Sequence, residues 1–176
     1  GVSVTNALAK RLEVTVYREG QVATLAFAGG DVVEPLQVRK AGAGDRRQGT
    51  TVRVWPDPKY FESAELPKAE LMHLLRSKAV LMPGVSVTLK NEKSDDTQTW
   101  LYKGGLRDYL GQSLTADPLI PMFEGEGFAD ASHESFAEGE GAQWCVAFTE
   151  EGQPVRESYV NLIPTSAGGT HESGLR

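Results

Sequence analysis

Two polar residues stand where the sequence alternation would put side chains on the inner face of a strand. Arg18 continues the phase of Val14 and Val16. Thr50 opens a second run that continues with Val52. A charge or hydroxyl on such a face needs a hydrogen-bond partner, a pocket or an escape to water. The guanidinium of Arg18 could lie at the edge of a pocket or reach solvent beside the turn, and the sequence favours neither position. The hydroxyl of Thr50 would most commonly bond to nearby backbone.

Gly1, Val2 and Ser3 open a short helical pattern over residues 1–9. The first N–H groups of a helix lack partners within it and carry a partial positive charge, which suits phosphate. Most helix starts bind nothing, however. This feature alone therefore does not establish an anion site.

Other familiar arrangements for catalysis or metal binding are missing from the sequence. The glycine-rich stretch 41–49 lacks the Lys-Ser/Thr pair of a P-loop, so we interpret it as a solvated hairpin loop. The three histidines, His73, His133 and His171, are not accompanied by carboxylates or thiols at metal-ligand spacing, and we predict no metal site. No nucleophile–base motif is present, so we assign no catalytic residue.

The composition is typical of a soluble globular chain. Its 176 residues carry a formal net charge of −6 and are 40% hydrophobic, and no apolar run reaches the length of a membrane span. Surfaces that grip DNA cluster Lys and Arg, so the acidic balance argues against a DNA-binding domain in this segment taken alone. The one cysteine, Cys145, excludes an internal disulfide and fits a reducing compartment, and we interpret it as buried and inert.

Hydrophobic periodicity predicts the elements that must position these residues. Pro35 favours an edge strand or a break, and residues 115–143 look irregular, with one short strand. The order of elements predicts an α+β fold with mostly antiparallel sheets rather than a doubly wound parallel sheet. Helical spacing predicts helices over residues 66–80 and 106–114 and at both chain ends. Alternation predicts strands over residues 11–18, 21–27, 31–39, 50–55, 85–89 and 97–103, and a strand pair over 143–149 and 154–163.

Three stretches together resemble the GyrB/ParE family, the B subunits of bacterial type II topoisomerases. Residues 1–8 resemble the end of its glycine-rich ATP lid, and residues 49–57 resemble its Gly-Thr-x-Val-x-Phe-Trp-Pro strand. Residues 158–165, which run on to Gly168-Gly169-Thr170-His171, resemble the ParE (topoisomerase IV) version more than the gyrase version. The similarity follows the family's order along essentially the whole chain and is weakest over residues 116–141.

The resemblance implies two domains. Residues 1–103 would be the C-terminal half of a GHKL-type ATPase domain, in which helices lie on one face of a mixed sheet. Residues 104–176 would begin a transducer domain with a ribosomal-S5-like α+β fold. The glycine pair Gly104-Gly105 is expected to interrupt the secondary structure, and its position agrees with that boundary.

The resemblance also implies roles for the residues singled out above. In this family ATP binding closes a lid and dimerises two B subunits around DNA, while a ParC-type A subunit cuts and rejoins DNA in the cytoplasm. Gly1, Val2 and Ser3 match lid residues near the nucleotide phosphates. Thr50 matches a residue that helps to read the adenine, and Arg18 matches a pocket-edge arginine that coumarin-type inhibitors contact. We therefore expect these groups to meet at one concavity on one side of the sheet.

Parts of the machinery are expected outside this chain. In the family, the general-base glutamate, the asparagine that binds Mg²⁺ and the adenine-binding aspartate precede the position of Gly1, and a phosphate-binding lysine follows that of Arg176. We therefore expect a segment of a longer protein, with ATP and Mg²⁺ as cofactors and the metal ligand elsewhere. We also expect no ATP hydrolysis by this chain alone.

Two other interpretations stay open. A gyrase B subunit differs from the ParE interpretation only around residues 158–165 and in the middle loop. A non-enzymatic nucleic-acid-binding module is the alternative from another class, because S5-like folds also occur in RNA-binding proteins. The acidic charge and the lack of a basic, aromatic face count against that module.

Overall fold

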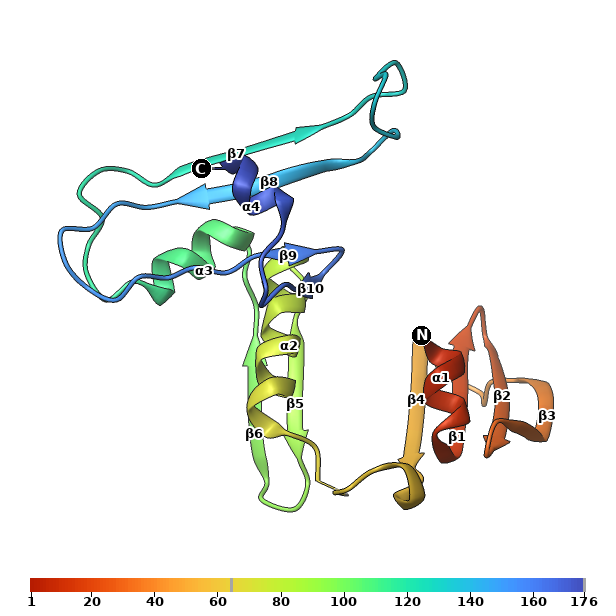
Figure 1. The fold of residues 1–176 in the computed structure, drawn as a ribbon. Coiled ribbons are helices and arrows are strands. Elements are labelled where there is room, and N and C mark those ends of the chain that lie inside the picture. The colour runs from red at the N-terminus through yellow and green to blue at the C-terminus, as the bar shows by residue number, and fades with distance from the viewer. Residues whose placement is uncertain (64, 176) are drawn as a thin grey trace. The chain divides into compact units, whose positions relative to one another are not determined.

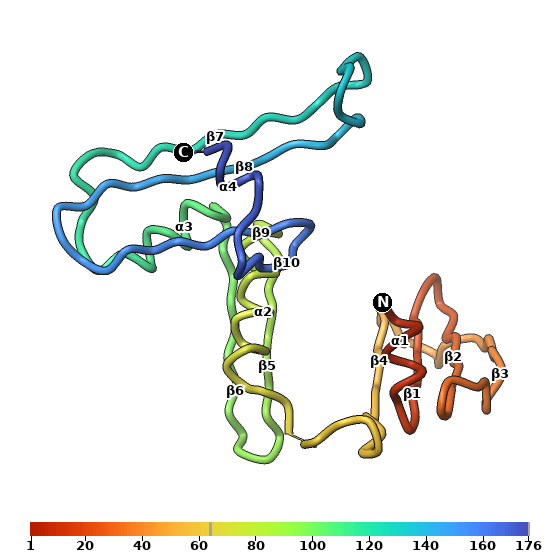
Figure 2. The backbone as a smooth tube through the Cα atoms, in the orientation of Figure 1, coloured from red at the N-terminus to blue at the C-terminus, as the bar shows by residue number. Residues whose placement is uncertain are grey.

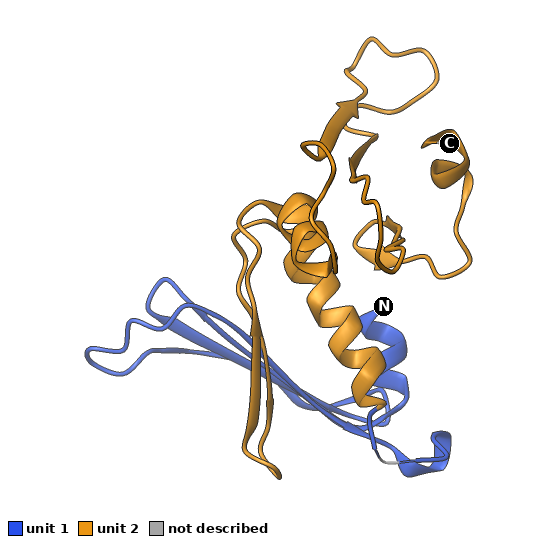
Figure 3. Cartoon of the chain, turned by 90° about the vertical axis from the view of Figure 1, so that its left-hand side faces the viewer, with its two compact units in different colours: residues 1–66 blue, residues 67–176 orange. Residues whose placement is uncertain are grey.

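The chain divides into two compact units, Gly1–Leu66 and Pro67–Arg176, which Figure 3 colours separately. The computed structural model describes residues 1–63 and 65–175. Its elements are labelled in Figure 1, and Figure 2 follows the same backbone as a tube. All strand pairs in the described residues are antiparallel. The predicted α+β class with mostly antiparallel sheets is therefore confirmed.

The first unit is a four-stranded sheet in the order β3-β2-β1-β4 with one helix. The chain enters through helix α1 (Val2–Ala7) and turns between β1 and β2 at Glu19 and Gly20, whose φ angles are 51° and 71°. Two left-handed residues in a two-residue loop give the turn whose twist matches that of the flanking strands. The strands are β1 (Ala9–Arg18), β2 (Gln21–Ala28), β3 (Asp31–Lys40) and β4 (Gly49–Pro56), followed by the short helix η1 (Pro58–Tyr60).

Strand β3 lies at the edge of the sheet, as Pro35 predicts. Its pairing with β2 shifts register near this proline, between the partners of Thr24 and Ala26. Proline has no N–H to donate to a neighbouring strand, so an edge position with an irregular ladder costs least. Every residue of β3 is exposed in the structure.

A chain of ion pairs covers one buried position of this sheet. Ala26 lies between Glu13 on β1 and Glu34 on β3 in the cross-strand register. The Arg11 guanidinium contacts both carboxylates, each at 2.6 Å, and Ala26 beneath it is only 2% exposed. Here the arginine stem and its two partners take the place of a packed layer.

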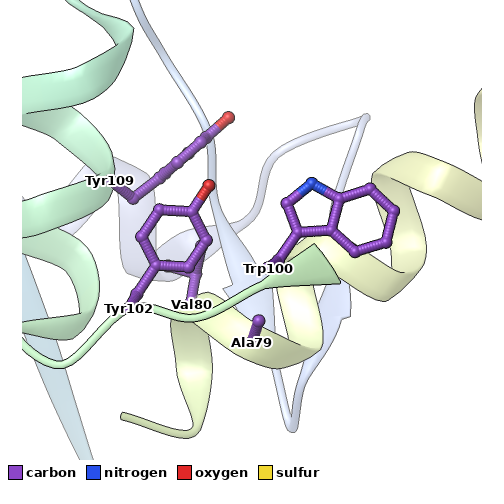
Figure 4. Close-up of a cluster of buried hydrophobic side chains, with 5 residues drawn as sticks. All are labelled: Ala79, Val80, Trp100, Tyr102 and Tyr109. Carbon is purple, nitrogen blue, oxygen red and sulfur yellow. The ribbon is translucent and has the colours of Figure 1, made fainter. Parts of the chain in front are cut away.

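The second unit begins with a helix laid along a hairpin. Helix α2 (Lys68–Leu81) contacts β5 (Val87–Asn91), which pairs with β6 (Asp96–Trp100), and helix α3 (Gly105–Ser113) comes next (Figure 1). At the start of α3, Gly105 has a φ of +56°, and a Cβ there would meet Pro83 at 3.0 Å, so this position requires glycine. The core, shown in Figure 4, consists of Ala79, Val80, Trp100, Tyr102 and Tyr109.

One predicted strand pairing is wrong. Residues 143–149 do not pair with 154–163: β8 (Gly141–Val146) pairs with β7 (Phe123–Phe128), and β9 (Tyr159–Val160) pairs with β10 (Ile163–Pro164). The sequence of β7, Phe-Glu-Gly-Glu-Gly-Phe, contains residues that strands disfavour. It forms because Trp144 of β8 lies across the space left by Gly125, its direct partner. The last helix, α4 (Thr170–Leu175), lies where a terminal helix is expected.

The compact units do not follow the boundary expected near residue 103. The α2–β5–β6 layer shares its core with Tyr109 of α3, so residues 67–100 group with the C-terminal part of the chain. The assignment of residues 1–103 and 104–176 to two domains stays a prediction. Among the described residues no helix is long and apolar enough to cross a lipid bilayer.

Candidate functional site

Thr50 and Arg18 lie on the same face of the first unit's sheet. Thr50 is the direct partner of Val16 across β1 and β4. Arg18 is two residues further along β1, and side chains two apart in a strand point to the same face. Both residues are exposed in this unit. The sheet therefore presents a hydroxyl and a guanidinium side by side near the β1–β2 turn.

Among the described residues, the guanidinium of Arg18 is held only by a surface contact. Its Nε donates to Oε1 of Glu19 at 3.1 Å, and the two side chains are 81% and 77% exposed. An ion pair this exposed contributes little stability. The guanidinium thus reaches solvent beside the turn and is accessible to a ligand, and this exposure is compatible with both alternatives for Arg18.

Helix α1 lies over the same face at the other end of the strands. Its residues Val4 and Leu8 line a pocket of about 260 Å³ together with Val54 and Phe61. Val54 is the cross-strand partner of Leu12, which belongs to the phase of Val16 and Arg18. The helix, Thr50 and Arg18 therefore share one face of the sheet, although they occupy different stretches of it. Neither Gly1 nor Thr50 nor Arg18 lines this pocket, so the expectation that the three meet at one concavity is not confirmed.

Element lengths limit how closely Gly1 can approach the other two residues. From Gly1 to Ala9 the helix spans at most roughly 14 Å, at 1.5 Å per residue plus one chain step. From Ala9 to Arg18 the strand extends roughly 30 Å, at 3.3 Å per residue. Gly1 thus lies at least roughly 16 Å from Arg18. Only an elongated ligand along the strands could contact both ends of this face.

The N-terminal residues Gly1, Val2 and Ser3 are exposed at the start of α1. The carbonyl of Gly1 accepts from the N–H groups of Val4 and Thr5 at 3.1 and 3.3 Å, which closes the first helical turn. The N–H groups of the residues between them have no partner within the helix. No hydrogen bond joins residues 1–3 to Arg18 or Thr50 in the described part of the chain.

Asn6 fixes α1 in place, a role that no motif of the sequence indicated. Its Nδ2 donates to the carbonyl of Gly30 at 3.2 Å, which ties the helix to the β2–β3 turn. Its Oδ1 is buried without a partner among the described residues. A buried acceptor left in this way is costly, so the contact with Gly30 determines the orientation of the amide. In the sequence, this role is indicated only by the presence of an asparagine within a helical run.

Two of the three histidines, His73 and His133, make local hydrogen bonds. His133 Nδ1 accepts from the N–H groups of Ser135 and Phe136, each at 3.2 Å, and His73 Nδ1 lies 3.2 Å from Arg76. Among residues 1–63 and 65–175, no group of three His, Cys, Asp or Glu side chains could hold a metal ion. Cys145 is half-buried, not fully buried as predicted. Even this partial burial raises the pKa of its thiol, which disfavours the reactive thiolate.

Comparison with known proteins gives relatives along the entire chain. A family model described as DNA gyrase B matches residues 105–176. The B subunit of DNA topoisomerase 4 from Salmonella typhimurium is 45% identical over 177 residues, and that from Escherichia coli is 44% identical over 179. The B subunit of DNA gyrase from Haloferax volcanii is 36% identical over 183 residues. Each alignment covers 100% of this chain and 27% of the relative, so the chain spans about a quarter of their length.

Two solved structures resemble the fold of the chain. The 43K ATPase domain of Thermus thermophilus gyrase B, in complex with an aminocoumarin, superposes with a TM-score of 0.77 at 29% identity, over 97% of this chain and 45% of that one. The topoisomerase IV ATP-binding domain of Francisella tularensis, in complex with a small-molecule inhibitor, gives 0.67 at 29% identity, over 99% and 45%.

Proposed function

Because the chain belongs to the GyrB/ParE family of type II topoisomerase B subunits, we propose that it forms part of an ATP-operated clamp of the topoisomerase IV kind. In such a clamp, ATP binding and hydrolysis would drive passage of one DNA segment through another. The observation that carries this proposal is the 45% identity to a topoisomerase IV relative over the whole chain.

The fold is proposed to follow the family's two domains. Residues 1–103 would be the C-terminal half of a GHKL-type ATPase domain, and residues 104–176 the start of an S5-like transducer domain. The gyrase B family model begins at residue 105, next to the glycine pair 104–105, which supports this boundary.

The sheet face of the first unit is the proposed nucleotide site. Gly1, Val2 and Ser3 would bind phosphate oxygens through N–H groups at the start of α1, and Thr50 would contact the adenine end. An elongated nucleotide suits the spacing of these residues along the strands. The general base and the Mg²⁺ ligand are proposed to lie in other parts of the protein, so this chain supplies binding and orientation.

Arg18 is proposed to contact coumarin-type inhibitors at the edge of this site. Its guanidinium is exposed on the Thr50 face and contacts Glu19. A similar ATPase domain has been solved with an aminocoumarin, which supports the view that related domains bind such compounds.

The proposed partners are those of a topoisomerase IV enzyme. A ParC-type A subunit would cleave and rejoin DNA, and two B subunits would dimerise through their ATPase regions when ATP binds. DNA contacts would depend mainly on other parts of the enzyme, because this segment carries a net charge of −6. The cytoplasm is the proposed location.

Gyrase is the second candidate, supported by gyrase relatives at 36% and 30% identity. The full-length protein, mixed with its A subunit and ATP, separates the two. The topoisomerase IV proposal predicts decatenation of linked circles and relaxation of supercoils. Introduction of negative supercoils into relaxed DNA would favour gyrase, and no ATP-dependent strand passage at all would reject both.

A further inference from the structure

One carboxylate in the second unit joins three elements. Tyr109 of α3 donates its hydroxyl to Glu157 Oε1 at 2.5 Å. Tyr159 of β9 donates to the other oxygen, Oε2. Arg76 of α2 places Nη2 3.7 Å from Oε1. Hydrogen bonds to an ionised carboxylate are stronger than those between neutral groups, so Glu157 forms a polar junction between α2, α3 and β9.

The guanidinium of Arg76, the cation of this junction, also contacts Tyr109 and His73. The Arg76 guanidinium lies 5.0 Å from the centroid of the Tyr109 ring, and its Nη2 donates to His73 Nδ1 at 3.2 Å. The side chains of Arg76 and Glu157 are 35% and 25% exposed. Such partial burial makes the pair stronger than a fully exposed one and restricts its rotamers.

The two phenols are kept as neutral donors. Burial, followed by the hydrogen bond to Glu157, raises the pKa of Tyr109 to about 12. The same causes raise the pKa of Tyr159. Both hydroxyls therefore keep their protons throughout the physiological range and can hold the carboxylate continuously.

A second contact binds the same hairpin to α2. The ammonium group of Lys78 donates to the carbonyl of Leu162, in the turn between β9 and β10. Arg76 and Lys78 are two residues apart on α2, so two cations of this helix meet the segment 157–162. The hairpin is thus attached to α2 at both its entry and its turn.

We propose that Glu157 is a positioning residue that makes the β9–β10 hairpin move as one body with the packed helices α2 and α3 and so couples ATP turnover to DNA strand passage. This inference rests on the proposed function. In that proposal α2 precedes the boundary at residues 103/104, whereas Tyr109 and Glu157 follow it. The junction therefore crosses from the ATPase side to the transducer side, where motion must be transmitted.

A purely structural role makes a different prediction. If Glu157 only stabilised the fold, its loss would lower ATP hydrolysis and strand passage in proportion, along with the melting temperature. A coupling role instead changes the number of strand passages per ATP hydrolysed. The ratio of the two activities therefore separates the roles.

The experiment uses the full-length protein with its A subunit and catenated DNA. Glu157→Gln keeps the shape and removes the charge, and Glu124→Gln is the matched control, because Glu124 pairs with Arg107 at 2.9 Å entirely on the downstream side of the boundary. We expect E157Q to lower decatenation per ATP by roughly fivefold and E124Q to leave it unchanged. The double variant Tyr109→Phe with Tyr159→Phe keeps the rings and should lower the ratio in the same direction.

Hydrogen exchange in the same full-length proteins provides a readout without turnover. E157Q should speed amide exchange in residues 159–163 relative to wild type, and E124Q should not. A ratio within about twofold of wild type, a proportional fall of both activities, or unchanged exchange would each overturn the inference. A wild-type protein without ATP-dependent strand passage would reject the proposed function, and the coupling role with it, whatever the exchange result.

Discussion

At the scale of single residues, the sheet face that carries Arg18 and Thr50 is predictable because strand alternation fixes which face a side chain occupies. The exposure of these two side chains cannot be predicted from the alternation of residues along the strand. The sequence pattern suggests an inner face, yet Val52 of the same run is 53% exposed. A face of a sheet is buried only where another layer covers it, and local alternation does not reveal which layer that is.

Replacing Arg18 by alanine should weaken the binding of a coumarin-type inhibitor to the full-length protein. The variant loses a charge-assisted hydrogen bond worth about 1.5–3 kcal/mol, which corresponds to about 10- to 150-fold in affinity. Arg47→Ala is the control, because Arg47 lies over the ring of Tyr17, whose phase is opposite to that of Arg18. Calorimetric titration measures both, and equal affinity for R18A and wild type would remove Arg18 from the site.

Leu162 occupies a conformation that suits asparagine or glycine. Its φ of 68° is left-handed, and the preceding Asn161 has a φ of 48°. A leucine at such an angle carries strain of about 1 kcal/mol. Leu162→Asn should therefore raise the free energy of unfolding by about 0.5–1 kcal/mol in denaturant titration. Leu36→Asn, at an exposed position of β3 whose φ is not positive, should give no gain. A loss of stability in L162N would contradict the strain.

At the scale of elements, most helices and strands follow from periodicity, and the failures occur where a strand lacks it. The β1–β2 hairpin alternates clearly, and helices α2 and α3 carry apolar residues at helical spacing. Strand β7 does not, because Gly125 and Gly127 interrupt its pattern. The predicted partner of residues 143–149 is therefore wrong, since the contact of Gly125 with Trp144 joins residues that no local pattern connects.

The two glycines of β7 should respond differently to the same substitution. A Cβ on Gly125 would lie 2.6 Å from Trp144 Cζ2, whereas a Cβ on Gly127 would meet nothing within 4 Å. Gly125→Ala should therefore push the indole aside and destabilise the hairpin by about 1–3 kcal/mol. Gly127→Ala should be neutral or slightly stabilising, because alanine loses less backbone entropy. Thermal unfolding monitored by tryptophan fluorescence measures both, and equal melting temperatures would contradict the contact.

At the scale of the whole molecule, the family is predictable from three ordered motifs, whereas the junction at Glu157 is not. Arg76, Tyr109 and Glu157 lie in different elements, and their spacing along the chain carries no signal of contact. Asn6 and Gly30 also lie far apart along the chain, and their spacing does not indicate the hydrogen bond between them. Contacts between distant elements depend on packing such as the core of Figure 4, which brings α2 and α3 together.

The 176-residue chain alone should hydrolyse no ATP above background. In the proposed function the general base and the metal ligand would belong to other parts of the protein, and positioning without them would not activate the attacking water. A phosphate-release assay on the purified chain, with the full-length protein as the positive control, checks this. Turnover by the isolated chain would show that catalytic groups lie within these residues.

Binding of a non-hydrolysable ATP analogue to the full-length protein tests the nucleotide face most directly, with two neighbouring threonines as the probe. Thr50 pairs with Val16 and Thr51 with Thr15, so their side chains occupy opposite faces of the sheet. Thr50→Val should weaken binding by about 2- to 12-fold, the equivalent of one hydrogen bond of about 0.5–1.5 kcal/mol, and Thr51→Val should leave it unchanged. Equal affinities of the two variants, or a loss confined to T51V, would contradict the assignment of this face to the nucleotide.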